Sequence, residues 1–174
     1  MGFAQSGSGE QLFALAERIE SSAVGTAIAE SRYLYAIIEG VHLIGLTVAV
    51  GLLFVIDLRL IGAFLRTVPV SDLLRQLRPW VFAGFGLIVL TGGLLFWSSA
   101  TEELSSPPFA IKMGLVALGA LNALYFELVS ANSPAVRGNH AVLPWKIRFA
   151  GAASLAIWTL VIVAGRLIPY LPRW

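Results

Sequence analysis

Residues 33–56 read YLYAIIEGVHLIGLTVAVGLLFVI, a run in which only Glu39 and His42 interrupt an otherwise apolar or weakly polar sequence. A helix of about 20 apolar residues crosses a hydrocarbon core about 30 Å thick. Three further segments have the same character: 80–97, 109–129 and 149–168. The chain is therefore predicted to be an all-α integral membrane protein, a bundle of four transmembrane helices.

The composition agrees with a membrane class and excludes several others. Hydrophobic residues make up 57% of the 174 positions and charged residues only 13%, whereas a soluble domain of this size needs more polar surface. The chain has no cysteine, which excludes disulfides, thiolate metal sites and iron–sulfur clusters. Its net charge of +2 is not gathered in a basic stripe, so no nucleic-acid partner is expected.

Residues 1–32 form a separate N-terminal segment, ahead of a transmembrane domain at 33–174. From Glu10 onward the apolar residues recur at helical spacing and leave Glu17, Arg18 and Glu20 largely on other faces. The segment has neither the basic start nor the continuous apolar core of a cleavable signal peptide. It is predicted to be an amphipathic helix on the membrane surface, with a soluble helix that caps the bundle as the alternative.

The charges in the connections predict the orientation. The two connections that follow the first and third spans are basic: Arg59, Arg66, Arg75 and Arg78 in one, and Arg137, Lys146 and Arg148 in the other. The turn 98–108 has two acidic residues and neither lysine nor arginine. By the positive-inside rule the basic connections face the cytoplasm. Both termini are then expected on the outer, periplasmic side of a bacterial inner membrane.

Four ionisable groups fall in the outer half of the spans under this topology. At a rise of 1.5 Å per residue, Glu39 lies about 9 Å and His42 about 14 Å below the outer surface. Lys112 lies about 5 Å deep, and Arg166 is a few ångströms from the same surface. Glu39 and His42 share one helical face because they are three residues apart. Since charge inside a bilayer is costly, these residues are the candidates for function.

Three interpretations of this cluster remain open. In the first, His42 is an axial ligand to the iron of haem b, Lys112 and Arg166 hold the propionates, and Glu39 orients the histidine. Met113 is a candidate sixth ligand, because the only other histidine, His140, falls in a predicted cytoplasmic connection. In the second, the cluster is a proton or anion site. In the third it is structural, with Glu39 neutralising Lys112 or Arg166 and His42 donating to a backbone carbonyl.

Polar residues nearer the inner side are predicted to be structural. Asp57 and Arg59 end the first span, where arginine is expected to reach the headgroups. Asn122 lies in the middle of the third span and is expected to form a hydrogen bond to a neighbouring helix. Glu127 is expected to pair with Arg148.

Several stretches of the sequence carry a resemblance to a known family. The longest are 30–35 (ESRYLY), 38–45 (IEGVHLIG) and 57–62 (DLRLIG), and shorter matches include Pro79-Trp80, Phe109 with Lys112, Ser154 with Trp158, and Gly165-Arg166. Together they resemble the family of small bacterial four-helix membrane proteins described as domain of unknown function 6644. The resemblance implies the fold and no established activity. In that family the position of Glu127 is often histidine, so glutamate here weakens a haem site with two histidines.

These residues predict a non-catalytic accessory subunit of a larger membrane complex that binds haem b through His42 for electron transfer. A small homo-oligomeric transporter or proton-linked permease is the alternative, and it requires water access to Glu39 and His42. A purely structural membrane protein is the third interpretation. The sequence has no phosphate-binding loop, hydrolase elbow or zinc-ligand spacing, so no catalytic activity of the chain on its own is expected.

Overall fold

The described part of the chain is helical throughout. The computed structural model describes residues 7–131, 133–138 and 142–171, and within these ranges it has no strand. The helices, in chain order, are α1 (Gly7–Glu20), α2 (Ala23–Glu30), α3 (Leu34–Ile61), α4 (Val70–Ser98), α5 (Ala100–Leu104), α6 (Pro107–Tyr125), the π-helical turn η1 (Phe126–Ser130), α7 (Pro134–Arg137) and α8 (Trp145–Leu167).

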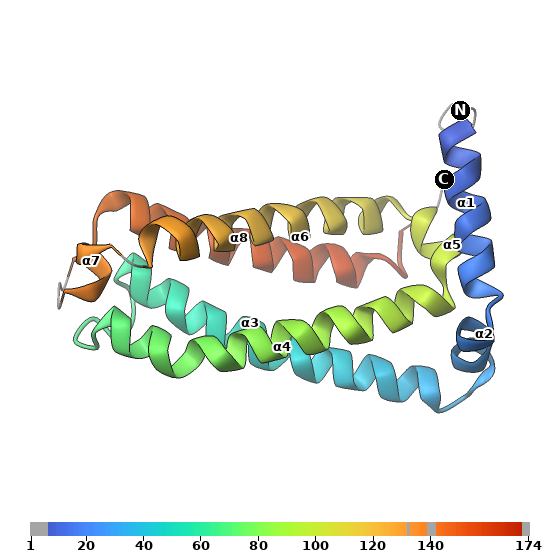
Figure 1. Ribbon diagram of the computed structural model, residues 1–174, viewed down its shortest axis with the longest axis horizontal. Helices are drawn as coiled ribbons and strands as arrows, with labels where there is room; N and C mark the ends of the chain where they lie inside the picture. Colours follow the sequence, from blue (N-terminus) through green and yellow to red (C-terminus); the bar gives the residue numbers. More distant parts are fainter. Residues whose placement is uncertain (1–6, 132, 139–141, 172–174) are drawn as a thin grey trace.

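Four of these helices are long and apolar enough to cross a membrane: Leu34–Ile61, Val70–Ser98, Pro107–Ser130 and Trp145–Leu167. They run side by side as the long bundle of Figure 1. The predicted four-span, all-helical fold is confirmed.

Helix α4 extends beyond the predicted second span. It begins at Val70, ahead of the predicted span 80–97, so Pro79 lies inside the helix. Charged residues in the first turns lower the hydropathy there, but Leu73 and Leu74 are buried in an apolar cluster with Leu60 of α3. Burial of one face therefore extends the helix beyond its continuously apolar part.

Close packing joins the four long helices in the order α4–α3–α8–α6. A methyl group built on Gly84 of α4 would lie 2.7 Å from the Cβ of Ala49 of α3. Gly151 of α8 is equally close to α3, since a methyl group there would lie 2.9 Å from the Cβ of Leu60. Gly119 of α6 packs on Trp158 of α8, with a corresponding distance of 3.0 Å. Absence of a side chain thus allows the helix backbones to approach closely at Gly84 and Gly151, and makes room for the Trp158 ring at Gly119.

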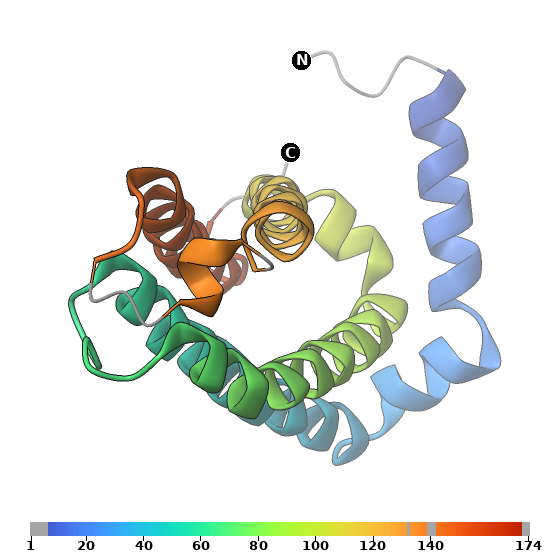
Figure 2. The ribbon, with the colours of Figure 1, turned by 60° about the vertical axis from the view of Figure 1, so that its left-hand side comes forward.

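The row of helices curves without closing. Figure 2 shows α4 and α6 at its two ends. In the described part of the chain these two helices have few close backbone contacts, and near α5 the rings of Phe96 and Phe109 stack with their centres 5.6 Å apart. The two helices are joined through α5 at one end of the bundle. The bundle therefore has an open side between α4 and α6.

Helices α1 and α2 lie across the end of the bundle at α5, roughly perpendicular to the long helices (Figure 1). Ser22 separates the two helices and caps α2 by accepting a hydrogen bond from the backbone N of Gly25 at 3.3 Å. The Trp97 indole donates to the Ser22 hydroxyl at 2.9 Å, and Glu20 accepts hydrogen bonds from Thr101. The segment predicted as one surface helix is thus two helices, anchored to the bundle end.

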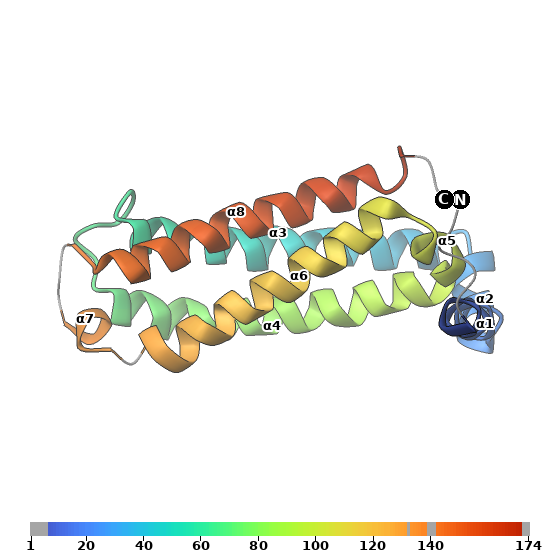
Figure 3. The ribbon, with the colours of Figure 1, turned by 90° about the horizontal axis from the view of Figure 1, so that it is seen from above.

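The opposite end of the bundle, at α7, is closed by the connection 62–69 and by α7 (Figure 3). Gly62 ends α3 with a positive φ of 84°, a conformation that glycine adopts without strain. The Arg59 side chain donates from Nε to the carbonyl of Val68 at 2.7 Å. This end is therefore held by local backbone contacts as well as by an apolar cluster.

Candidate functional site

His42 of α3 faces α4, where its imidazole meets a threonine. Nδ1 of His42 lies 2.8 Å from Oγ1 of Thr91. The Thr91 hydroxyl has one proton, and it donates that proton to the carbonyl of Leu87 at 2.7 Å. In the tautomer that has its proton on Nδ1, the ring donates to Thr91 and keeps its lone pair on Nε2.

Gly92 makes room for this arrangement. A methyl group on Gly92 would lie 3.1 Å from Cε1 of His42 and 3.6 Å from its Nδ1. The imidazole thus packs directly on the backbone of α4. Neither Thr91 nor Gly92 was predicted as part of the site, although both stand in the Thr-Gly-Gly stretch of the second span.

Lys112 and Glu39 are the charged groups that act on His42 electrostatically. The side chain of Lys112 packs on Gly165 of α8, where a methyl group added to the glycine would lie 3.7 Å from Cδ of the lysine. The Lys112 ammonium lies 5.9 Å from the centre of the Phe109 ring. Glu39 is exposed. In the described chain no ion pair within 4.0 Å joins Glu39 to Lys112, so direct neutralisation of that pair is not observed.

The other two predicted members, Arg166 and Met113, are exposed. The Arg166 guanidinium is exposed and stacks over the Tyr170 ring at 5.5 Å. Met113 is 48% exposed on the surface of α6. His140, which was predicted to lie in a cytoplasmic connection, is outside the described residues. The structure thus gathers Glu39, His42 and Lys112 and offers no second haem ligand from Met113.

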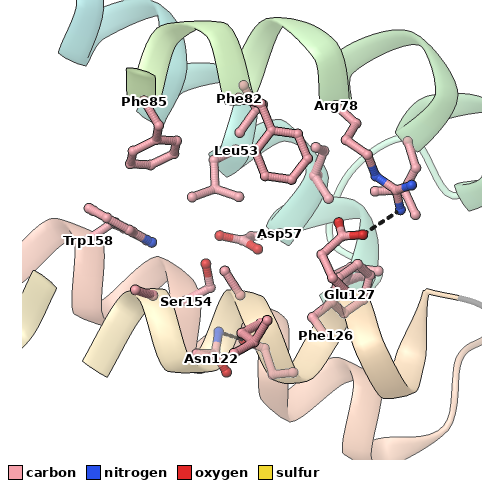
Figure 4. Close-up of a pocket in the computed structure, with 18 of the residues that line it drawn as sticks. Leu53, Asp57, Arg78, Phe82, Phe85, Asn122, Phe126, Glu127, Ser154 and Trp158 are labelled. Atoms are coloured by element: carbon pink, nitrogen blue, oxygen red, sulfur yellow. Dashed lines mark hydrogen bonds and ion pairs between the residues drawn. The ribbon is translucent and has the colours of Figure 1, made fainter. Parts of the chain in front are cut away.

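A second site, absent from the sequence-based prediction, lies nearer the α7 end. A cavity of about 570 Å³ opens between α4 and α6, with α3 and α8 behind it. Figure 4 shows the carboxyl group of Asp57, the hydroxyl of Ser154 and the ring of Trp158 around the same space. Because sequence periodicity does not say which helices fail to pack, it gave no signal for this cavity.

The prediction that Asp57 and Arg59 are interfacial residues, with arginine reaching the headgroups, is wrong. Both side chains are buried, at 2% and 1% exposure. The Ser154 hydroxyl lies beside the Asp57 carboxyl group (Figure 4), and the carboxyl oxygen Oδ2 is buried without a hydrogen-bond partner. Helix α3 continues past Asp57 to Ile61, and the apolar residues of that last turn were the missed signal.

Glu127 pairs with a different residue from the one predicted. Its carboxylate lies 3.1 Å from Nη2 of Arg78 on α4, across the open side of the bundle. Arg148 instead donates from Nε to the carbonyl of Ile61 at 3.0 Å. The Arg78–Glu127 ion pair bridges α4 and η1 at the α7 end of the cavity (Figure 4).

The predicted hydrogen bond of Asn122 to a neighbouring helix is confirmed. Asn122 of α6 donates from Nδ2 to the carbonyl of Ala150 of α8 at 3.2 Å. Trp158 is 8% exposed and packs on Phe85, with ring centres 4.7 Å apart. Both residues also line the cavity.

Comparison with known proteins identifies the family and no activity. No curated protein and no solved structure matches the chain. A family model, described as a family of unknown function, matches residues 15–171 and so includes all four membrane-spanning helices. The resemblance seen in the sequence motifs is thereby confirmed: the chain belongs to the family of unknown function DUF6644.

Proposed function

We propose that this protein is a non-catalytic accessory subunit of a larger membrane complex and that it carries haem b through His42. The observation that supports this proposal is the hydrogen bond from His42 Nδ1 to Thr91. Metal-binding histidines are commonly held by a hydrogen bond at the other ring nitrogen, which fixes the tautomer and the ring orientation. Nε2, with its lone pair, is then the ligand atom.

The residues around His42 fit a haem in part. The Lys112 ammonium and the Arg166 guanidinium both stand nearer the α5 end than His42, at positions suited to two propionates. Bound haem would supply a one-electron carrier, and Thr91 would keep the His42 ring in place. Met113 points to the surface, so any sixth ligand comes from outside the described residues or the position stays open.

Membership in a complex is supported by charge on the bundle surface. Glu39 and Arg166 are exposed within or next to the spans. A charge that faces lipid costs several kcal/mol on insertion scales, about 2.5–3.5 for arginine or aspartate at the helix centre. A neighbouring subunit that covers these groups removes that cost. We further propose that the α7 end faces the cytoplasm of a bacterial inner membrane, because the basic residues gather there.

Absorption spectroscopy tests the haem proposal. The protein is purified in mild detergent from haem-replete cells, and oxidised and dithionite-reduced spectra are recorded. We expect a Soret band with sharp reduced α and β bands, and we expect His42→Ala to abolish them. His140→Ala removes the only other histidine and is the matched control, which should keep the spectrum.

A featureless spectrum of the unaltered protein, or an unchanged Soret band in His42→Ala, would refute the haem assignment. Membership in a complex is measured separately as the mass of the particle extracted in mild detergent. A second polypeptide in constant ratio to the 18.7 kDa chain supports it. A particle that contains only copies of this chain contradicts it.

A further inference from the structure

The cavity between α4 and α6 has one acidic side chain, Asp57, without an ion-pair partner in the described chain. Its ionisable lining groups are Asp57, Arg78 and Glu127. Arg78 and Glu127 neutralise each other in their 3.1 Å ion pair. In the described chain no basic side chain forms an ion pair with Asp57. The nearest arginine along α3, Arg59, uses its Nε for the Val68 carbonyl.

The carboxyl group of Asp57 faces the cavity. Its side chain is 2% exposed, and the Ser154 hydroxyl lies beside it (Figure 4). The buried Oδ2 has no hydrogen-bond partner, and Figure 4 shows the carboxyl group facing the open space. Burying a carboxylate without a cation or hydrogen-bond donors is unfavourable. A ligand with a positively charged N–H group would supply both the cation and the hydrogen-bond donor that the carboxyl group lacks.

The remaining walls suit an apolar body attached to such a cation. Besides Asp57, the ion pair, Asn122 and Ser154, the lining is apolar or aromatic, including Phe82, Phe85 and Trp158. Aromatic faces attract cations and pack against rings. A volume of about 570 Å³ lies within the range of small-molecule sites, roughly 300–1,000 Å³.

The cavity opens on the side of the bundle. Away from the Phe96–Phe109 stack near α5, helices α4 and α6 have few close backbone contacts in the described chain. Phe82 and Val89 of α4 and Leu124 of α6 line the cavity and are also exposed on the outer surface, at 58%, 74% and 53%. These side chains form the rim of an opening toward the hydrocarbon of the bilayer. A ligand must therefore be soluble in lipid.

From these observations we propose that the cavity is a binding site for a lipophilic monovalent cation, a protonated amine on an apolar or aromatic body. The ammonium group donates to the Asp57 carboxyl group, and the body lies between Phe82, Phe85 and Trp158. The ligand enters between α4 and α6 from the membrane. This site is separate from His42, so it does not depend on the haem proposal.

A matched pair of probes tests the charge requirement. The probes are 2-(1-naphthyl)ethylammonium and 2-(1-naphthyl)ethanol, which have similar size and differ in charge. Binding is measured by equilibrium dialysis against the purified protein in mild detergent, with empty micelles as the blank. We expect the unaltered protein to bind the amine more tightly than the alcohol, after the blank is subtracted.

Three variants locate the site. Asp57→Asn should weaken amine binding about tenfold or more, the size expected for a lost charged hydrogen bond, with little effect on the alcohol. Asp72→Asn makes the same chemical change in a carboxylate of α4 that lies outside the cavity and pairs with Arg75, and it should change neither affinity. Ala123→Phe fills the cavity and keeps its charge, and it should weaken both probes. Circular dichroism establishes that each variant is folded.

Equal binding of the amine to the unaltered protein and Asp57→Asn would overturn the proposal. So would a preference of the unaltered protein for the alcohol, which needs no variant to detect. Unchanged binding in Ala123→Phe would place the probe elsewhere and have the same consequence. A phospholipid that co-purifies with the unaltered protein, is lost in Ala123→Phe and blocks the amine would identify lipid as the occupant instead.

Discussion

Replacement of Gly84 by alanine should destabilise the bundle, whereas the same change two residues later should not. The new Cβ at Gly84 would lie 2.7 Å from the Cβ of Ala49 and 3.3 Å from its Cα. Carbon atoms in good contact are about 3.5–4.0 Å apart, so α3 and α4 must separate by roughly 1 Å. At Gly86 a methyl group would meet nothing within 4 Å.

The size of the effect follows from two opposing contributions. Overpacking of a close contact costs about 1–3 kcal/mol. Alanine is favoured over glycine inside a helix by about 1 kcal/mol or less, and this gain is common to both positions. Gly84→Ala should therefore be about 1–3 kcal/mol less stable than Gly86→Ala.

Unfolding in SDS–detergent mixed micelles, followed by far-ultraviolet circular dichroism, measures the difference. Ala49→Gly provides a further check, because it removes the methyl group that Gly84→Ala would strike. The two changes together should show a favourable coupling energy, although the 3.3 Å approach to the Cα of Ala49 keeps the recovery partial. Equal stability of Gly84→Ala and Gly86→Ala, or no coupling with Ala49→Gly, would refute the close-packing explanation.

Two other contacts give predictions of a different kind. Asn122→Ala removes the hydrogen bond to the Ala150 carbonyl. It should lower the unfolding free energy by about 0.6 kcal/mol and by no more than about 1.7 kcal/mol. Thr159→Ala, which loses only a hydrogen bond within its own helix, is the control, and an equal loss of stability in both variants would contradict an interhelical role. Glu20→Ala removes the acceptor of two hydrogen bonds from Thr101, at 3.1 and 2.5 Å. It should speed amide hydrogen exchange in α1 and α2 while exchange in α3 stays the same, and uniform acceleration would argue against a local anchor.

Local sequence patterns predicted the features of this molecule that depend on one helix at a time. The four spans follow from hydropathy, since each helix must satisfy its backbone internally and cover itself with apolar side chains. The interhelical bond of Asn122 was predictable because an amide in the middle of a span needs a partner. Close contacts at Gly84 and Gly92 also agree with their two-turn spacing on one face of α4.

The errors concern features that depend on which helices are neighbours. Glu127 pairs with Arg78 because η1 and the start of α4 face each other across the open side of the bundle, a relation that sequence distance does not encode. Asp57 was predicted to lie at the membrane interface because its charge was taken to mark the end of the span. The last turn of α3 instead packs on Gly151 of α8, and the Asp57 side chain is buried. A cavity arises where two neighbouring helices do not pack on each other. Hydropathy indicates which helices enter the membrane and does not indicate which of them pack together.

The two proposed sites are physically independent, although α3 supplies the central residue of each. His42 and Asp57 are separated by about 22 Å along that helix at 1.5 Å per residue. His42 meets α4 through Thr91, whereas Asp57 meets α8 through Ser154. Because α3 lies within the packed row, between α4 and α8, it can present a side chain to each neighbour at a different depth. A change at one site thus needs a shift of the whole α3 helix to reach the other, and the small-residue contacts at Ala49–Gly84 and Leu60–Gly151 oppose such a shift.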